Sequence, residues 1–427
     1  MNPIDLMRAS FDAAVRAADP LRIVAAHLPA PPRGRVLVVG AGKAAASMAL
    51  AVERAWPGVD LHGLVITRYA HGAPTQRIRV VEAGHPVPDS AGEGAAREIL
   101  QLVSQLAADD LLLVLVSGGG SSLLSLPVPP VSMTDMKSVT SMLLASGAPI
   151  GEMNIVRKHL SQIVGGRLAA AASATGTHVI ALIISDVTGD APSDIASGPC
   201  AADPSTYADA LAVLSRNRVA APQSVSTWLQ RGADGDVAET PKPGDAWFAQ
   251  VENRVIATAH RSLKAAAEVF HANGINAISL GDTVTGEARE VAKVYAALVR
   301  EIRTRKQPVA PPVALISGGE CTVTLPPGTN GRGGRCTEFL LSLAVELGGM
   351  PDVHALACDT DGIDGSEENA GAWLSPDSMG TALKHDVSAR AALDKHDSYG
   401  FFKASGELIV TRPTCTNVND YRVILIR

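Results

Sequence analysis

The sequence predicts a two-domain α/β protein, and three observations lead to this fold class. With 427 residues the chain is longer than one hydrophobic core usually organises, so two domains of roughly 200 residues are expected. Hydrophobic residues make up 46% of the chain but aromatic residues only 4%, which favours aliphatic strands covered by Ala-rich helices. From Val36 onward, short β-branched or Leu-rich runs alternate with stretches of helical length, which indicates βαβ units and a parallel sheet.

The first half of the chain alternates between predicted strands and helices. We expect strands near residues 35–39, 62–67, 111–116 and 179–184, and helices near residues 43–55, 90–107, 134–146 and 154–174. Asp89 is a suitable cap for the second of these helices. An additional helix is expected at the N-terminus, because Asn2 can cap it and Pro3 suits its first position.

A segment rich in Gly, Pro and Asp separates the two halves. Residues 231–245 lack hydrophobic periodicity, which indicates an interdomain linker or a long surface loop. A second α/β series follows, with strands near 254–258, 276–280, 313–316, 353–357, 407–411 and 421–426 and helices near 260–272, 286–304 and 337–347. We therefore expect an N-terminal domain over residues 1–240 and a C-terminal domain over residues 241–427.

The charge and the apolar runs of the chain point to a small-molecule partner. A net charge of −6 gives no long-range attraction to nucleic acid or to an anionic membrane, so a phosphorylated ligand must be held by local cations. The longest apolar runs, 111–116 and 179–184, are far shorter than the roughly 20 residues that span a bilayer. We expect neither a nucleic-acid partner nor a membrane segment.

The N-terminus and the cysteines favour a cytoplasmic protein. Asp5 and Asp12 interrupt any apolar signal region near the N-terminus. The 5 cysteines form no CxxC pair and are odd in number, which is typical of reduced thiols. A monomer and a homo-oligomer are both compatible with the sequence.

Most of the unusual glycine-rich segments follow a predicted strand, at the sheet edge where helix N-termini converge and ligands bind. In the first, Gly40, Gly42 and Lys43 bring backbone N–H groups and an ammonium to one small volume, which favours an anion. The segment also fits the dinucleotide pattern GxGxxA. Thr67 and Arg68, however, stand where the ribose-binding acid belongs, so only an NADP interpretation through Arg68 stays open.

The second glycine-rich turn follows the strand expected at 111–116. It consists of Ser117, Gly118, Gly119, Gly120, Ser121 and Ser122. Its glycines can adopt positive φ, so the turn can form a nest of N–H groups for a phosphate or carboxylate. A tight turn packed against a helix is the structural alternative. Because no GxSxG pattern is present, neither Ser121 nor Ser122 is expected to be an acyl-transfer nucleophile.

The third turn follows the strand expected at 179–184 and carries two carboxylates, Asp186 and Asp190. Such a pair can hold Mg²⁺ through water, which is the usual arrangement for a metal shared with a nucleotide. Asp186 is also the candidate general base for a substrate hydroxyl. A role as turn residue is the alternative for Asp190.

The second half offers three further ligand groups at strand ends and helix entrances. Gly318, Gly319 and Glu320 form another glycine-rich turn after a predicted strand. Arg335 lies at the entrance of a predicted helix, where a guanidinium can meet a phosphoryl group during transfer. Asp361 follows a strand and can bind a metal or substrate hydroxyls, or act as an ordinary turn acid.

Two more segments supply candidates for substrate binding. Arg157 and Lys158, close to Asn154 on an Ala-rich helix, can bind a carboxylate, and solvated surface charges are the alternative. Asn417 and Asn419 lie just before the last predicted strand. Their amides can bind hydroxyls or form Asx turns.

These turns belong to longer motifs that stand in order along essentially the whole chain. The motifs are GAGKAAASMA at 40–49, SGGGSSLLSLP at 117–127, MNIVRKHLSQIVGGRLA at 153–169, SDVTGDAPSDIASGP at 185–199, SGGE at 317–320, GRGGR at 331–335, DTDGIDG at 359–365 and TNVND at 416–420. Together they resemble the glycerate 2-kinase family that carries a C-terminal MOFRL domain. The ordered set is far more specific than any single motif.

The resemblance implies ATP- and Mg²⁺-dependent phosphorylation of D-glycerate to 2-phosphoglycerate. It implies a Rossmann-like N-terminal domain with a parallel sheet, a smaller α/β domain with a MOFRL region over about residues 312–420, and an active site in the cleft between them. The functional lysine and arginine of the family match Lys43 and Arg335.

An alternative activity and several sequence departures accompany the resemblance. Similar members of the family carry the label hydroxypyruvate reductase, so an NAD(P)H-dependent reductase acting in tartrate metabolism is the alternative. The chain departs from the family pattern at Val164, Cys336, Thr337, Arg412 and Cys415. Neither of the two main cations is among these positions.

Overall fold

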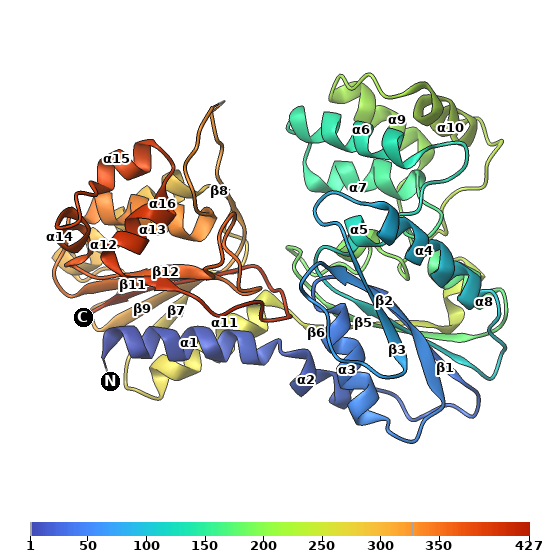
Figure 1. Ribbon diagram of the computed structural model, residues 1–427, viewed down its shortest axis with the longest axis horizontal. Coiled ribbons are helices and arrows are strands. Elements are labelled where there is room, and N and C mark those ends of the chain that lie inside the picture. Colours follow the sequence, from blue (N-terminus) through green and yellow to red (C-terminus); the bar gives the residue numbers. More distant parts are fainter. Residues whose placement is uncertain (1, 327) are drawn as a thin grey trace. The chain divides into compact units, whose positions relative to one another are not determined.

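The computed structural model describes residues 2–326 and 328–427, which form two compact units (Figure 1). The N-unit is Pro20–Ile256, and the C-unit combines residues up to Asp19 with Ala257–Arg427. The expected boundary after residue 240 differs from this division in two respects. The N-terminal helix packs within the C-unit, and the strand Val251–Ala257 extends the sheet of the N-unit.

The N-unit contains a six-stranded sheet in the order β3-β2-β1-β4-β5-β6. Its strands are β1 (Val36–Ala41), β2 (Leu61–Arg68), β3 (Ile78–Ala83), β4 (Leu111–Val116), β5 (His178–Ile184) and β6 (Val251–Ala257). β1 pairs in parallel with β2 and β4, and the pairs β2–β3 and β4–β5 are parallel as well. Because the strand order reverses between β1 and β4, their carboxyl ends form the topological switch point where such sheets bind ligands.

Both faces of this sheet are covered, which explains the continuous apolar runs. Every residue of β1 and β4 is buried. α4 (Ser90–Val103) and α8 (Arg167–Ser173) pack on one face, and α3 (Ala45–Ala55) contacts β1, β2 and β4. The parallel sheet predicted for the first half is therefore confirmed.

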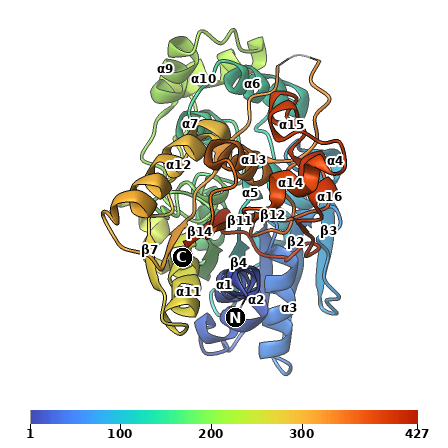
Figure 2. The same cartoon turned by 90° about the vertical axis from the view of Figure 1, so that its left-hand side faces the viewer.

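A group of helices in the N-unit forms a second apolar cluster. α6 (Met133–Ala145), α7 (Ile150–His159), α9 (Tyr207–Arg216) and α10 (Gln223–Ala233) gather at one end of the unit (Figure 2). The shorter helical elements are α2 (Pro20–Ile23), η1 (Val24–His27), α5 (Gly120–Leu123), η2 (Ile195–Ser197) and η3 (Ala246–Gln250).

One expectation for the N-unit is wrong, and one of two open alternatives is decided. The helix expected over 154–174 is broken between α7 and α8, because Gly165 and Gly166 adopt φ values of +63° and +81°, outside the right-handed helical region. Of the two alternatives for the segment 231–245, the structure supports the loop and not the interdomain linker. It is a loop of the N-unit, in which Thr240 is only 1% exposed.

The C-unit contains a mixed six-stranded sheet in the order β13-β12-β11-β14-β9-β7. Its strands are β7 (Asn276–Ser279), β9 (Val313–Ser317), β11 (Val353–Asp359), β12 (Gly371–Leu374), β13 (Leu408–Ile409) and β14 (Asp420–Ile426). β8 (Gly286–Glu287) and β10 (Cys321–Thr322) form a separate parallel pair. In the six-stranded sheet, β7 pairs with β9 in parallel, but β9, β14, β11, β12 and β13 pair antiparallel. The second α/β domain is therefore confirmed, but its sheet is mostly antiparallel, which the alternation of strands and helices did not reveal.

Alternate residues of these strands face two different helical layers. Ile424 and Ile426 of β14 pack with α12 (Ala288–Arg305) and α13 (Arg335–Leu347), whereas Val423 and Leu425 pack with α1 (Pro3–Ala17) and α11 (Ala259–His271). Figure 1 shows α1 and α11 on one side of the sheet and α12 and α13 on the other. The remaining helices are α14 (Ser378–Leu383), α15 (Ala389–Asp394) and α16 (Ser398–Ser405).

The predicted N-terminal helix is confirmed as α1. The Asn2 side chain accepts a hydrogen bond from the Ile4 N–H at 3.2 Å, and Pro3 occupies the first helical position. Ser10 on this helix shares a 2.6 Å hydrogen bond with the Tyr421 hydroxyl of β14. Among the described helices, none combines the length and the apolar character needed to cross a membrane.

Candidate functional site

The carboxyl ends of β1 and β4 are joined by backbone hydrogen bonds. The N–H of Ser117 donates to the carbonyl of Ala41 at 3.2 Å, and the N–H of Lys43 donates to the carbonyl of Gly118 at 2.8 Å. The hydroxyl of Ser117 accepts a hydrogen bond from the N–H of Ala44 at 3.0 Å. Each of the first two glycine-rich turns directly follows a strand, as the sequence predicted, and the structure shows that they lie side by side at the switch point, where the backbone of Lys43 is held.

Close packing accounts for the glycines of the first turn. A Cβ on Gly40 would lie 2.0 Å from the carbonyl oxygen of Leu115, and a Cβ on Gly42 would lie 2.1 Å from the Ser117 hydroxyl. Gly42 also has a φ of +141°. Both positions thus require glycine because β1 and β4 approach each other so closely, whether or not a ligand binds here.

Only part of the expected nest is formed in the second turn. Gly119 has a φ of +81°, but neither Gly118 nor Gly120 has a positive φ. Ser117 is fully buried and bonded to the first turn, and the hydroxyl of Ser122 donates to the carbonyl of Gly119 at 3.1 Å. The serines therefore stabilise the turn itself, and the backbone around Gly119 is the part of it that suits an anion.

A chain of polar side chains leads from this turn to α7. The Ser121 and Ser197 hydroxyls lie 2.9 Å apart, and the Ser197 hydroxyl donates to Asn154 Oδ1 at 3.2 Å. Asn154 Oδ1 also accepts a 2.7 Å hydrogen bond from the guanidinium of Arg157. Asn154 and Ser197 are buried. The structure thus links Asn154 and Arg157, two of the predicted substrate-binding residues, to the glycine-rich turn.

Lys158 has a different environment from its neighbour Arg157. Its Nζ lies 3.6 Å from Asp203 Oδ1 and 3.8 Å from Asp194 Oδ1, and its side chain is only 5% exposed. A buried ammonium with two carboxylates is compensated within the protein. The contacts of Lys158 therefore indicate an ion pair that stabilises the fold.

Asp186 and Asp190 lie in the loop after β5, where both side chains are partly exposed. Asp190 adopts a left-handed backbone conformation with a φ of +54°. Such a conformation is uncommon for residues other than glycine and is typical of turns and of functional sites. Two partly exposed carboxylates fit the usual Mg²⁺ arrangement, in which one or two protein carboxylates leave room for water and phosphate.

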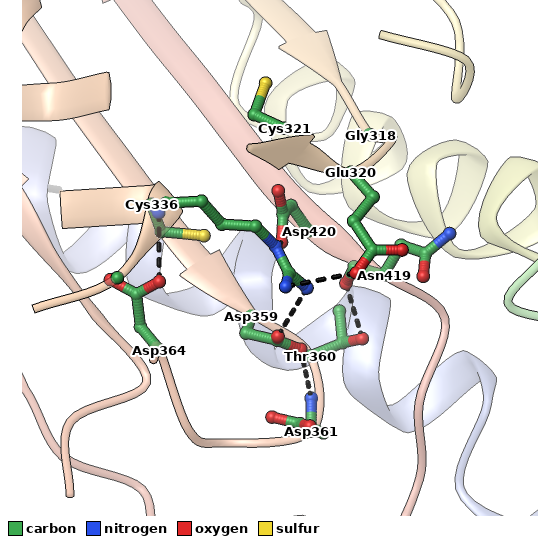
Figure 3. A network of polar contacts seen from close by, with 12 residues as sticks. Gly318, Glu320, Cys321, Cys336, Asp359, Thr360, Asp361, Asp364, Asn419 and Asp420 are labelled. Carbon is green, nitrogen blue, oxygen red and sulfur yellow. Dashed lines mark hydrogen bonds and ion pairs between the residues drawn. The ribbon is translucent and has the colours of Figure 1, made fainter. Parts of the chain in front are cut away.

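In the C-unit, Arg335 is held by three carboxylates, and Figure 3 labels the residues that supply them, Glu320, Asp359 and Asp420. Its Nε donates to Asp420 Oδ1 at 2.7 Å, one terminal nitrogen donates to Asp359 Oδ2 at 2.8 Å, and the other lies 3.1 Å from Glu320 Oε1. Burial lowers the pKa of the guanidinium, but the three carboxylates outweigh burial and raise it above its usual value. Arg335 is therefore the centre of an acidic cluster.

Sequence reasoning missed two members of this cluster, Asp420 and Arg422. Asp420 is fully buried and bonds both Arg335 and Arg422, and Arg422 also donates to the Gly318 carbonyl at 2.8 Å. The two residues are separated by two positions on β14, so their side chains lie on the same face of the sheet. The sequence signal that could have identified them is an acid and an arginine two positions apart at the start of the last strand, which places both side chains on one face.

The Gly318–Glu320 turn is part of the same arrangement. Gly319 has a φ of +100°, and a Cβ there would lie 2.2 Å from the carbonyl oxygen of Val284. Its carbonyl accepts a hydrogen bond from the N–H of Asp420 at 3.1 Å. Gly319 thus has a packing reason, and the Glu320 side chain contributes the most exposed carboxylate of the cluster.

The remaining predicted residues of the C-unit make turn-type hydrogen bonds. Asp361 Oδ1 accepts from the N–H of Ile363 at 2.8 Å, and Asn417 Oδ1 accepts from the N–H of Asn419 at 3.3 Å. Asn419 has a φ of +65°. These contacts match the turn alternatives for both segments. Figure 3 shows Asp361 and Asn419 close to Asp359 and Asp420.

Asp364 has a structural position that the sequence did not reveal. Its carboxylate accepts hydrogen bonds from the N–H groups of Cys336 and Thr337 at 2.9 and 2.8 Å, in the first turn of α13. Burial raises the pKa of Asp364 to about 6, against the hydrogen bonds from Cys336 and Thr337, which lower it. Asp364 therefore fixes the start of the helix that carries Arg335.

Two family descriptions match the chain. Residues 6–230 match a domain of unknown function, DUF4147, and residues 313–420 match the MOFRL family. The first covers most of the N-unit, and the second covers β9, β11, β12 and β13 of the C-unit together with Glu320, Arg335, Asp359 and Asp420.

Individual proteins are similar over almost the full length. A putative hydroxypyruvate reductase of Agrobacterium vitis is 51% identical, over 99% of this chain and 94% of its own. A D-glycerate 2-kinase of Thermotoga maritima is 38% identical, over 96% of this chain and 95% of its own. The crystal structure of a glycerate kinase from Thermotoga maritima has a TM-score of 0.86 and 37% identity, with 100% of both chains covered. A DUF4147 domain followed by a MOFRL region, with this similarity along the whole chain, makes the protein a member of the glycerate 2-kinase family.

Proposed function

We propose that the protein is an ATP-dependent glycerate 2-kinase that converts D-glycerate to 2-phosphoglycerate. The observation that carries the proposal is the 38% identity to a D-glycerate 2-kinase over 96% of the chain. The turns at the switch point of the N-unit support the proposal, because phosphoryl transfer requires mainly positioning and positive charge.

In the N-unit, the proposal assigns the nucleotide phosphates to the turns after β1 and β4. The backbone around Gly119 and the ammonium of Lys43 supply donors for phosphate oxygens. Lys43 is the cation that we expect to stabilise the phosphoryl group during transfer. Ser121 and the glycines at 40 and 42 shape the turns by the contacts described above.

The proposal assigns Mg²⁺ to the loop after β5. Asp186 and Asp190 would hold the ion, which when bound neutralises negative charge on the phosphates. Asp186 is in addition the candidate for accepting the proton of the substrate hydroxyl. Their partial exposure leaves space for water on the metal.

Arg335 is the second proposed cation. Because it is already paired with carboxylates, a phosphoryl group can bind it only by replacing one of them. All three of its nitrogens have carboxylate partners. The Glu320 side chain is 54% exposed, whereas those of Asp359 and Asp420 are 4% and 0% exposed. We therefore propose that a phosphoryl oxygen replaces Glu320, while Asp359 and Asp420 continue to hold the guanidinium.

The direct test is an assay of ADP release with ATP, Mg²⁺ and a series of small hydroxy acids, followed by phosphorus NMR of the product. We expect ADP release with D-glycerate and a phosphate ester on the 2-hydroxyl. A product phosphorylated on the 3-hydroxyl, or no ADP release with any acid, would contradict the proposal.

Because none of the 5 cysteines forms a disulfide, we also propose that the enzyme works in the cytoplasm.

A reductase is the second candidate, because the relative at 51% identity is named a putative hydroxypyruvate reductase. The first turn lies at the switch point where dinucleotides bind, but β2 ends in Thr67 and Arg68 rather than in an acid. Mixing the protein with hydroxypyruvate and NADH or NADPH tests this function. Steady loss of the reduced-nicotinamide absorbance would favour the reductase over the kinase.

A further inference from the structure

Arg157 is a guanidinium without a counter-charge in its surroundings. Its guanidinium donates a 2.7 Å hydrogen bond to the neutral amide oxygen of Asn154. No carboxylate of the described residues lies within ion-pair distance of it. Burial lowers the pKa of this guanidinium, and no charged group offsets the effect. The adjacent Lys158, in contrast, has two carboxylate partners.

An uncompensated cation that is largely surrounded by protein destabilises the fold, so such groups are usually paired or bind a ligand. A guanidinium has five N–H donors in a planar fork, and the bond to Asn154 uses one of them. The remaining donors suit the two oxygens of a carboxylate in a bidentate pair. The geometry at Arg157 thus favours an anionic ligand with two oxygens in one plane.

The orientation of Arg157 is fixed from the second glycine-rich turn. Asn154 Oδ1 accepts from both Arg157 and the Ser197 hydroxyl, so both of its lone pairs are used. Since Ser197 gives its only hydrogen to Asn154, Ser121 is the donor in the 2.9 Å contact between the two serines. The residues at 196, 197 and 198 have φ values of +51°, +57° and +62°. Left-handed conformations at the first two of these positions cost energy, which points to a functional placement of Ser197.

We propose that Arg157 binds the carboxylate of the acceptor acid, that Asn154 is its positioning residue, and that Lys158 takes no part in substrate binding. The inference rests on the proposed function, because it names the group that recognises the acid in the same site. It predicts specificity for hydroxy acids over uncharged polyols. The hydroxyl of Ser121 links this carboxylate site to the turn proposed to hold the nucleotide.

The variant Arg157→Gln tests the assignment. We expect the KM for D-glycerate to rise about 100-fold, because a charge-assisted bidentate pair is lost, and the KM for ATP to stay within about twofold. Arg157→Lys keeps the charge but loses the fork, so an increase of about tenfold is expected. Because a poorly compensated charge is removed, the thermal midpoint of Arg157→Gln should not fall. Arg97→Gln is the matched control, since Arg97 is an exposed arginine paired with Glu93 on α4.

A second variant, Asn154→Asp, tests the same site by adding a negative charge next to Arg157 instead of removing the positive one. It places a carboxylate beside Arg157 at nearly unchanged volume, so it should raise the thermal midpoint and weaken D-glycerate binding. A merely structural role of the pair would predict the first effect without the second. Weakened glycerate binding in a fully folded Asn154→Asp protein would therefore support the proposal.

Direct binding separates this inference from the proposed function. Calorimetric titration of the wild-type protein and of Arg157→Gln with D-glycerate, lactate and glycerol requires no turnover. We expect the two acids to bind the wild type and to lose affinity in the variant, even if the wild type transfers no phosphoryl group to glycerate. Equal binding of the acids to both proteins would overturn the inference, and so would a KM change confined to ATP.

Discussion

The N–H of Lys43 donates to the carbonyl of Gly118 at 2.8 Å, which ties the turn after β1 to the turn after β4. The two turns come from neighbouring parallel strands at the point where the strand order reverses. This hydrogen bond holds the backbone of Lys43 in place, so the ammonium extends from a fixed position. This arrangement is what an enzyme needs if the ammonium is to meet a charge that develops only during the reaction.

Replacement of Lys43 by Ala should reduce kcat by about 10²- to 10³-fold, because the ammonium is expected to stabilise charge in the transition state. The backbone bond to Gly118 does not depend on the side chain, so the thermal midpoint should stay close to that of the wild type. Steady-state kinetics with D-glycerate and ATP, together with thermal unfolding, measure both effects.

The control for this prediction is Lys264→Ala on α11, because Lys264 is an exposed lysine far along the chain from the glycine-rich turns. It should leave kcat unchanged. A Lys43→Ala enzyme with near-normal kcat would refute the catalytic assignment of Lys43.

Gly119→Ala should destabilise the N-unit by about 1–2 kcal/mol, because the φ of +81° is a left-handed conformation. A Cβ at this position would also lie 2.8 Å from the His85 ring. Since the backbone around Gly119 is proposed to bind phosphate, the KM for ATP should rise as well. Thermal unfolding and ATP-dependent kinetics test the two effects separately.

A second glycine provides the comparison for this substitution. Gly94 lies within α4, and a Cβ there would have no neighbour within 4 Å. Gly94→Ala should therefore stabilise the protein by about 0.5–1 kcal/mol through helix propensity, with an unchanged KM for ATP. If both alanine variants behaved alike, neither the conformation nor the binding role of Gly119 would be supported.

Arg335→Ala should lower both activity and stability, which distinguishes it from Lys43→Ala. The guanidinium pairs with the buried Asp359 and Asp420, and its removal takes a counter-charge from both, although Arg422 still pairs with Asp420. A loss of about 3–5 kcal/mol is expected for breaking such a buried pair. The ion pairs of Arg335 are the reason why its replacement, unlike that of Lys43, should lower stability.

Glu320→Gln tests whether a phosphoryl oxygen replaces Glu320 at the guanidinium of Arg335. Glu320 is the exposed partner of the guanidinium, so its loss should leave the thermal midpoint nearly unchanged. If a phosphoryl oxygen competes with Glu320 for Arg335, the KM for ATP should not rise in this variant. A marked loss of ATP affinity in Glu320→Gln would show instead that Glu320 itself helps to bind the nucleotide.

The sequence predicted the N-unit better than the C-unit, and the reason lies in the strands. β1 and β4 are buried on both faces and read as continuous apolar runs, which are visible without a structure. β3 was missed because most of its residues are partly or fully exposed, and β12 because it has only 4 residues, so neither strand forms such a run. Strand direction in the C-unit could not be predicted, since the pairing of β14 between β9 and β11 depends on contacts distant in sequence.

Only part of the candidate site could likewise be predicted from the sequence. Glycine-rich turns after strands identified Lys43, Gly119 and Asp186 as candidates. The same reasoning treated Arg157 and Lys158 alike, because adjacent basic residues on a helix give no indication of their partners. Their different surroundings depend on Asp194 and Asp203, which approach Lys158 only after the chain folds.

Asp186→Asn and Asp190→Asn should each increase the Mg²⁺ concentration required for half-maximal activity, because each variant removes one negative charge from the proposed metal site. Both carboxylates are partly exposed, so the thermal midpoint should change little. If Asp186 is also the general base, only Asp186→Asn should keep a low kcat at saturating Mg²⁺. The measurement is a Mg²⁺ titration of ADP release at saturating ATP and D-glycerate. Asp236→Asn, in an exposed loop of the same unit, is the control, and a Mg²⁺ requirement equal in all three variants would rule out the proposed site.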